Sequence, residues 1–183
     1  MNNSKPWIVL LAAYLAVYVE AWFDLPRKVL GAQVDLLTPL MVYAALRNGP
    51  GTIALLALFG GWAFDSLSLN PAGASVAPLL AIGWLINRQK YLILADQWEA
   101  QFALGLAASA AMPALVLMVL ATIGESPLLG WYSLWQWLVV SICGGVVTPV
   151  LFRLLDRLNR ALSYPVNRPL TFRPDREIDR GKY

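Results

Sequence analysis

The chain consists of long apolar stretches that are separated by short polar or turn-forming segments. Charged residues mark the ends of these stretches and seldom interrupt them. The apolar stretches are residues 6–23, 29–46, 52–64, 76–86, 100–123 and 131–152. A helix rises about 1.5 Å per residue and the hydrocarbon core of a bilayer is about 30 Å thick. The first stretch is therefore just long enough to span a membrane, and the last two span it easily.

The three middle stretches are expected to form short helices. The second is uninterrupted only over Leu36–Leu46, and the third is expected to stop at Asp65. Strong turn signals separate them: residues 47–51 read Arg-Asn-Gly-Pro-Gly, and residues 66–75 contain Asn-Pro and a further Gly. These reversals favour six spanning helices, of which the second to fourth are short. Four spans with a re-entrant hairpin are the alternative.

The composition indicates that lipid is the solvent for much of this protein. Hydrophobic residues make up 58% of the 183 residues and charged residues only 14%, whereas about 25% is usual for charged residues in soluble domains. A chain of this size cannot bury so much apolar surface within itself. No segment alternates like a strand of an outer-membrane barrel. The predicted fold is therefore all-α, a polytopic membrane domain of six transmembrane helices over residues 1–162.

The distribution of charge predicts the orientation. The formal net charge is +3, and 8 of the 14 Lys and Arg residues lie at or after Arg153. With six spans and both termini in the cytoplasm, the outer side holds only Arg27 and Lys28, and the other twelve are inside. The flanks of the first helix alone would favour the opposite orientation, but the later loops and the C-terminal segment outweigh them.

The end of the chain changes character after the last apolar stretch. Arg153, Asp156, Arg157 and Arg160 recur at helical spacing and are expected to share one face, with leucines largely on the other. The last helix is therefore expected to continue into the cytoplasm as a basic amphipathic segment beside anionic lipid headgroups. Residues 163–183 contain prolines and mixed charges, which predicts a disordered cytoplasmic tail. No nucleic-acid partner is expected.

Few residues could carry catalytic or metal chemistry. The chain has no His and one Cys, which excludes a Ser-His-Asp triad, a histidine metal site and a disulfide framework. Ionisable groups in apolar stretches are candidate functional residues by default, and Glu20, Asp35 and Asp65 qualify. Each also lies at a predicted helix end, where capping a helix is the alternative role. No catalytic, metal or cofactor site is expected.

Three short motifs carry a resemblance to a known family. They are Gly61-x3-Asp65-x7-Gly73, then Val34-Asp35-Leu36-Leu37, and then Gly144-Gly145-Val146-Val147-Thr148-Pro149 followed by Arg153. Over residues 11–161 their order and spacing resemble the rod shape-determining protein MreD family. Val34 stands where that family usually has Pro, and the charged segment after residue 163 is longer than usual.

The resemblance implies a non-enzymatic scaffold in the bacterial inner membrane, within the cell-elongation machinery that makes peptidoglycan. Its implied partners are MreC, RodA, the elongation-specific penicillin-binding protein and MreB. The residues implied for interaction are Asp35, Gly61, Asp65, Gly73 and Pro149. Asp65 is expected to accept backbone N–H bonds from the turn that follows it, fixing an outer hairpin that MreC contacts.

A second hypothesis comes from a further similarity. The MreD family distantly resembles the S components of energy-coupling-factor transporters, which also have six helices and bind small molecules. Ala12-x3-Ala16 in the first stretch is similar to the small-residue motif through which S components couple to their transporter. A small-molecule-binding S component is therefore the alternative function.

Overall fold

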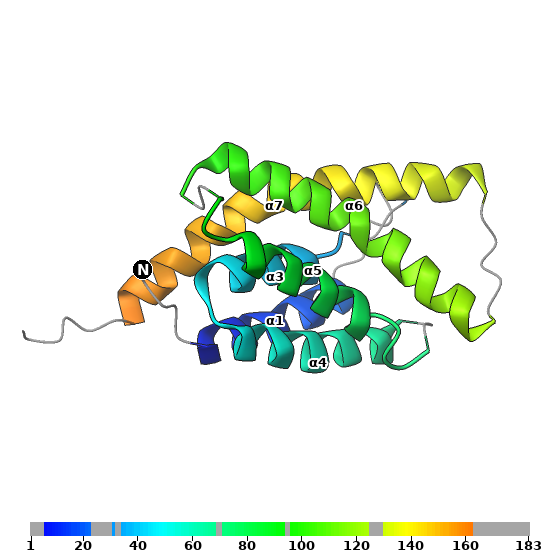
Figure 1. The fold of residues 1–183 in the computed structure, drawn as a ribbon, viewed down its shortest axis with the longest axis horizontal. Helices are drawn as coiled ribbons and strands as arrows, with labels where there is room; N and C mark the ends of the chain where they lie inside the picture. The colour runs from blue at the N-terminus through cyan, green and yellow to red at the C-terminus, as the bar shows by residue number, and fades with distance from the viewer. Residues whose placement is uncertain are drawn as a thin grey trace, which may run out of the picture.

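The computed structural model describes residues 6–22, 31, 34–68, 71–93, 96–124 and 130–162, and this part of the chain is helical with no strand. The helices are α1 (Pro6–Trp22), α3 (Leu37–Arg47), α4 (Pro50–Leu67), α5 (Val76–Gln89), α6 (Trp98–Ile123) and α7 (Trp131–Leu162). Figure 1 shows α1 and α4 lying side by side, with the long helices α6 and α7 crossing on the opposite side of α3 and α5. The expectation of an all-α fold is confirmed. The predicted tail at 163–183 lies outside the described residues.

Three of the described helices, α4, α6 and α7, are long and apolar enough to cross a membrane. Helix α1 is apolar but has 17 residues. Helices α3 and α5 have 11 and 14 residues, and at about 1.5 Å per residue α3 is only about 16 Å long. These lengths agree with a membrane protein, and the count of six spans stays a prediction.

The third helix is longer than its apolar stretch predicts. The stretch covers residues 52–64 and predicts a stop at Asp65, but α4 runs from Pro50 to Leu67. Pro50 begins the helix, where the missing N–H of proline has no consequence. Asp65 stays inside the last turn and is 2% exposed. A buried carboxylate does not end the helix here because the following loop supplies hydrogen bonds to it.

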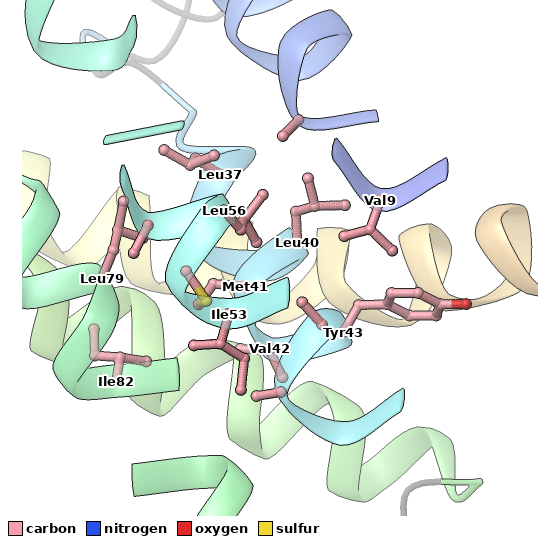
Figure 2. Close-up of a cluster of buried hydrophobic side chains, with 14 of the residues drawn as sticks. Val9, Leu37, Leu40, Met41, Val42, Tyr43, Ile53, Leu56, Leu79 and Ile82 are labelled. Carbon is pink, nitrogen blue, oxygen red and sulfur yellow. The ribbon is translucent and has the colours of Figure 1, made fainter. Parts of the chain in front are cut away.

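Helix α3 forms the centre of the molecule. All ten residues from Leu37 to Leu46 are buried, which is the pattern of a helix surrounded by other helices rather than of one with a polar face. Figure 2 shows side chains from three other helices around it: Val9 from α1, Ile53 and Leu56 from α4, and Leu79 and Ile82 from α5. Lipid tails are as apolar as these side chains, so close packing rather than transfer from water joins helices in a membrane, and this cluster packs the four helices together.

Helices α6 and α7 approach closely through small residues. A Cβ atom added at Gly144 would lie 1.9 Å from Ser109 Oγ, and one added at Gly105 would lie 2.1 Å from Thr148 Oγ1. Such contacts let helix backbones pack closely within a membrane. The spacing of Gly144 and Thr148 is thus part of a helix contact, and its partners on α6 are Gly105 and Ser109.

Helix α7 is bent but continuous. Pro149 lacks the N–H that would bond the Gly145 carbonyl, which is the usual cause of a kink. Figure 1 shows that α7 changes direction between its first half, in yellow, and its second half, in orange. The Thr148 hydroxyl donates to the Gly144 carbonyl oxygen at 2.7 Å. Beyond Pro149 the helix continues to Leu162, as the sequence predicts for the basic segment.

Candidate functional site

Asp65 holds the loop between α4 and α5. Its Oδ2 atom accepts hydrogen bonds from the backbone N–H of Gly73 at 2.9 Å and of Ser75 at 3.0 Å. Both donors lie just before the first residue of α5, and the carboxylate comes from the last turn of α4. The prediction that Asp65 accepts backbone N–H bonds from the following turn is confirmed.

The two glycines of the same motif allow this loop to close. Gly73 has a φ of +93°, a conformation that residues with a Cβ atom rarely adopt. Gly61 lies where α4 meets α5, and a Cβ atom there would be 3.0 Å from Val76 Cα. Gly61, Asp65 and Gly73 therefore form one structural unit, the α4–α5 hairpin.

Asp35 performs a similar task at the start of α3. Its Oδ1 atom accepts the backbone N–H of Leu37 at 2.8 Å and of Thr38 at 3.0 Å. The Thr38 hydroxyl donates to the other carboxylate oxygen. A side chain that accepts the first N–H groups of a helix is an N-cap. Of the two roles the sequence allowed for Asp35, the structure therefore shows capping.

A cavity of about 240 Å³ joins these elements at one end of the helices. It brings Asp35 together with Glu20 from the end of α1 and with two neighbours of Asp65, namely Phe64 and Ser75. Helices α6 and α7 complete the wall with Met112 and Val140, among others. Asp65 and Pro149 are not among the described lining residues. No sequence signal points to Ser75 at this place, since a lone serine before a helix is common.

A second polar cluster lies at the other end of α3 and was not predicted. Arg47 Nη2 contacts Asp96 Oδ1 at 2.8 Å and Asp156 Oδ2 at 3.2 Å. The Tyr43 hydroxyl donates to Asp156 Oδ1 at 3.0 Å. Burial acts to lower the pKa of Arg47, but the hydrogen bond with Asp96 and the charge of Asp156 outweigh it and raise that pKa above its usual value. A permanent cation thus ties α3 to α7.

The basic segment of α7 packs partly on the protein and is partly exposed. Phe152, Leu155 and Asn159 are buried, and Asp156 turns toward Arg47. Leucines at four-residue spacing are exposed, namely Leu154, Leu158 and Leu162. Arg153, Arg157 and Arg160 are exposed and border an open, polar cavity of about 570 Å³. The basic residues and the leucines therefore lie on different faces, as their spacing predicts, and the leucine face is partly packed on the protein and partly exposed.

The two ends of the molecule show that the first helices alternate in direction. The smaller cavity gathers the end of α1, the start of α3, the end of α4 and the start of α5. The Arg47 cluster gathers the end of α3, the segment before α6 and the end of α7. This arrangement agrees with the chain reversals predicted at residues 48–51 and 68–74.

Comparison with known proteins provides no relative: no family model, no curated protein and no solved structure matches the chain. The functional argument therefore depends on the residues and their geometry.

Proposed function

We propose that the protein is a non-enzymatic membrane scaffold of the bacterial cell-elongation complex, a member of the MreD family that acts with MreC in the inner membrane. In this proposal the chain crosses the membrane six times with both termini in the cytoplasm. RodA, the elongation-specific penicillin-binding protein and MreB belong to the same assembly.

The observation that carries the proposal is the α4–α5 hairpin. The spacing of Gly61, Asp65 and Gly73 is the most distinctive part of the resemblance to MreD. In the structure these three residues depend on one another, because the Asp65 carboxylate holds the N–H groups at the loop where Gly73 turns. A charge used to hold a loop backbone fits a fixed binding surface better than it fits a reacting group.

The exposed side chains also suit a protein embedded among lipids and other helices. Tyr14, Tyr18 and Trp22 are exposed on α1, and Phe59 and Trp62 are exposed on α4. Large apolar patches of this kind mark contact with a membrane or with other proteins. At the end of α7, the exposed leucines and arginines of the basic segment suit the border between lipid tails and anionic headgroups.

Replacement of the native gene tests the proposal. A rod-shaped bacterium depleted of its own MreD would be supplied with this chain together with MreC from the organism that the chain comes from. The expected result is rod-shaped cells when both are present and rounded cells when this chain is omitted. Rounded cells with both proteins inserted in the membrane at normal amounts would contradict the proposal.

The second candidate function is a small-molecule-binding S component of an energy-coupling-factor type transporter. The cavity at the end of α1 and α3 favours it, because buried polar groups and apolar side chains line it together. Co-purification distinguishes the two functions. An S component retains transporter ATPases and their membrane coupling subunit, whereas an elongation scaffold retains MreC.

A further inference from the structure

The 240 Å³ cavity between the helices combines an apolar wall with a small number of polar groups. Leu37, Phe64, Met112, Val116 and Val140 supply the apolar part. Glu20, Asp35, Thr38, Ser75 and Gln136 supply the polar part. Mostly apolar walls with a few converging polar groups are the usual construction of a small-molecule site.

The Ser75 hydroxyl is an unused hydrogen-bonding group at this cavity. Ser75 is fully buried, and its Oγ atom has no hydrogen-bond partner in the structure. Its backbone N–H is held by Asp65 at 3.0 Å, so the residue is fixed in place. A buried polar group without a partner destabilises the fold. A bound ligand that donates to this hydroxyl would remove that penalty.

Two carboxylates lie at the wall of this cavity. The carboxylates of Glu20 and Asp35 both line it, and no Lys or Arg is among its described lining residues. Glu20 is 8% exposed. The Asp35 carboxylate accepts two backbone N–H groups and the Thr38 hydroxyl, which leaves one of its roughly four lone-pair positions available. A positive charge within about 4–6 Å of a carboxylate stabilises its ionised form, so this wall suits a cationic ligand.

The size and lining of the cavity favour an organic cation over a metal ion. A volume of about 240 Å³ is far above the ~30 Å³ that one water molecule occupies in the liquid. No group of three or more His, Cys, Asp or Glu side chains that could hold a metal occurs in the described part of the chain. A bare ion would also leave the apolar wall without contacts.

We propose that this cavity binds a small amphiphilic organic cation, a primary ammonium group on a short apolar chain. The ammonium group donates to the carboxylates of Glu20 and Asp35 and to the Ser75 hydroxyl, and the apolar chain packs against Met112 and Val140. The proposal does not depend on the scaffold function, because it concerns the chemistry of the cavity alone.

The test uses the full chain purified in a neutral detergent and n-butylammonium chloride as the probe. Calorimetric titration is expected to show saturable binding with a Kd at or below about 1 mM. Two control solutes separate the contributions: n-butanol has the same chain without the charge, and sodium chloride has a cation without the chain. Both are expected to bind at least about tenfold more weakly.

Two variants of different chemistry keep the test decisive. Glu20→Gln is expected to weaken n-butylammonium binding at least about tenfold, and the matched control Glu99→Gln, on an exposed carboxylate of α6, is expected to leave it unchanged. Val140→Phe fills the cavity without changing charge and is expected to weaken binding similarly. The proposal is overturned if n-butylammonium does not bind the wild-type chain, if n-butanol binds as tightly, or if the folded variants bind as tightly as the wild type.

Discussion

Carboxylates at helix ends fix the backbone in this protein. Asp65 and Asp35 each accept two backbone N–H groups, one pair at the start of α5 and the other at the start of α3. A hydrogen bond to a charged group is worth about 1.5–3 kcal/mol, and its loss leaves a buried donor unsatisfied. The two acids therefore act as structural residues, and substitutions at them test that role.

Replacing Asp65 should destabilise the protein in a graded way. Asp65→Ala removes the acceptor of both N–H groups and should lower the free energy of unfolding by about 2–4 kcal/mol. Asp65→Asn keeps an amide oxygen as an acceptor and should be milder. Thermal unfolding of the purified variants in detergent measures the difference, with Glu99→Gln as the control for an exposed carboxylate. Equal loss of stability for Asn and Ala would show that the negative charge itself is required.

Gly144 should be intolerant of even one added methyl group. The Cβ atom in Gly144→Ala would meet Ser109 Oγ at 1.9 Å, so α6 and α7 must move apart at a cost of about 1–3 kcal/mol. Gly51→Ala is the matched control, since nothing lies within 4 Å of a Cβ atom there. Adding Ser109→Gly to Gly144→Ala should recover stability in the same unfolding assay. If the double variant is no more stable than Gly144→Ala alone, the contact with Ser109 is not the source of the strain.

At the scale of the elements, α3 is the helix that the others surround. It is covered by α1, α4, α5 and α6, and its second half is tied to α7 by Arg47 and Tyr43. The edge of the Tyr43 ring also packs on Phe152 of α7, with ring centroids 4.9 Å apart. The polar cluster thus positions the second half of α7, including its basic face.

The bond between Arg47 and Asp156 should contribute measurably to stability. Their side chains are 21% and 32% exposed, so part of the interaction is screened and about 1 kcal/mol is expected. A double-mutant cycle measures this contribution. Chemical unfolding of Asp156→Asn, Arg47→Gln and the double variant gives the coupling energy between the two side chains. Asp96→Asn is the control, because the Asp96 side chain is 87% exposed and should couple more weakly. A larger coupling energy between Arg47 and Asp96 than between Arg47 and Asp156 would contradict this prediction.

The sequence pattern predicted a helix well where the length of its apolar stretch determines where the helix begins and ends. The starts and ends of α1, α6 and α7 follow from the apolar runs and from the Trp and Gly residues beside them. The end of α4 was missed because Asp65 looks like a stop until its hydrogen-bond donors, eight and ten residues further on, are known. The Arg47 cluster was missed because its partners are far apart in the chain.

The positions of the two polar ends of the molecule predict its topology in the membrane. The helix ends that surround the cavity should face outward, and those that surround the Arg47 cluster should face the cytoplasm, where Lys and Arg are in excess. A reporter fused after Tyr183 should be cytoplasmic, and one inserted within residues 124–130 should be periplasmic. Paired alkaline phosphatase and fluorescent-protein fusions measure this. A periplasmic C terminus would overturn the six-span arrangement.

We propose that the Asp65 hairpin supports a surface that binds MreC. The direct measurement is the amount of MreC from the same organism retained by this chain after co-expression and purification in detergent, per mole of folded chain. The wild type and Asp65→Asn should retain MreC, and Asp65→Ala should lose most of it. Retention by the wild type no higher than by an unrelated polytopic membrane protein would contradict the claim.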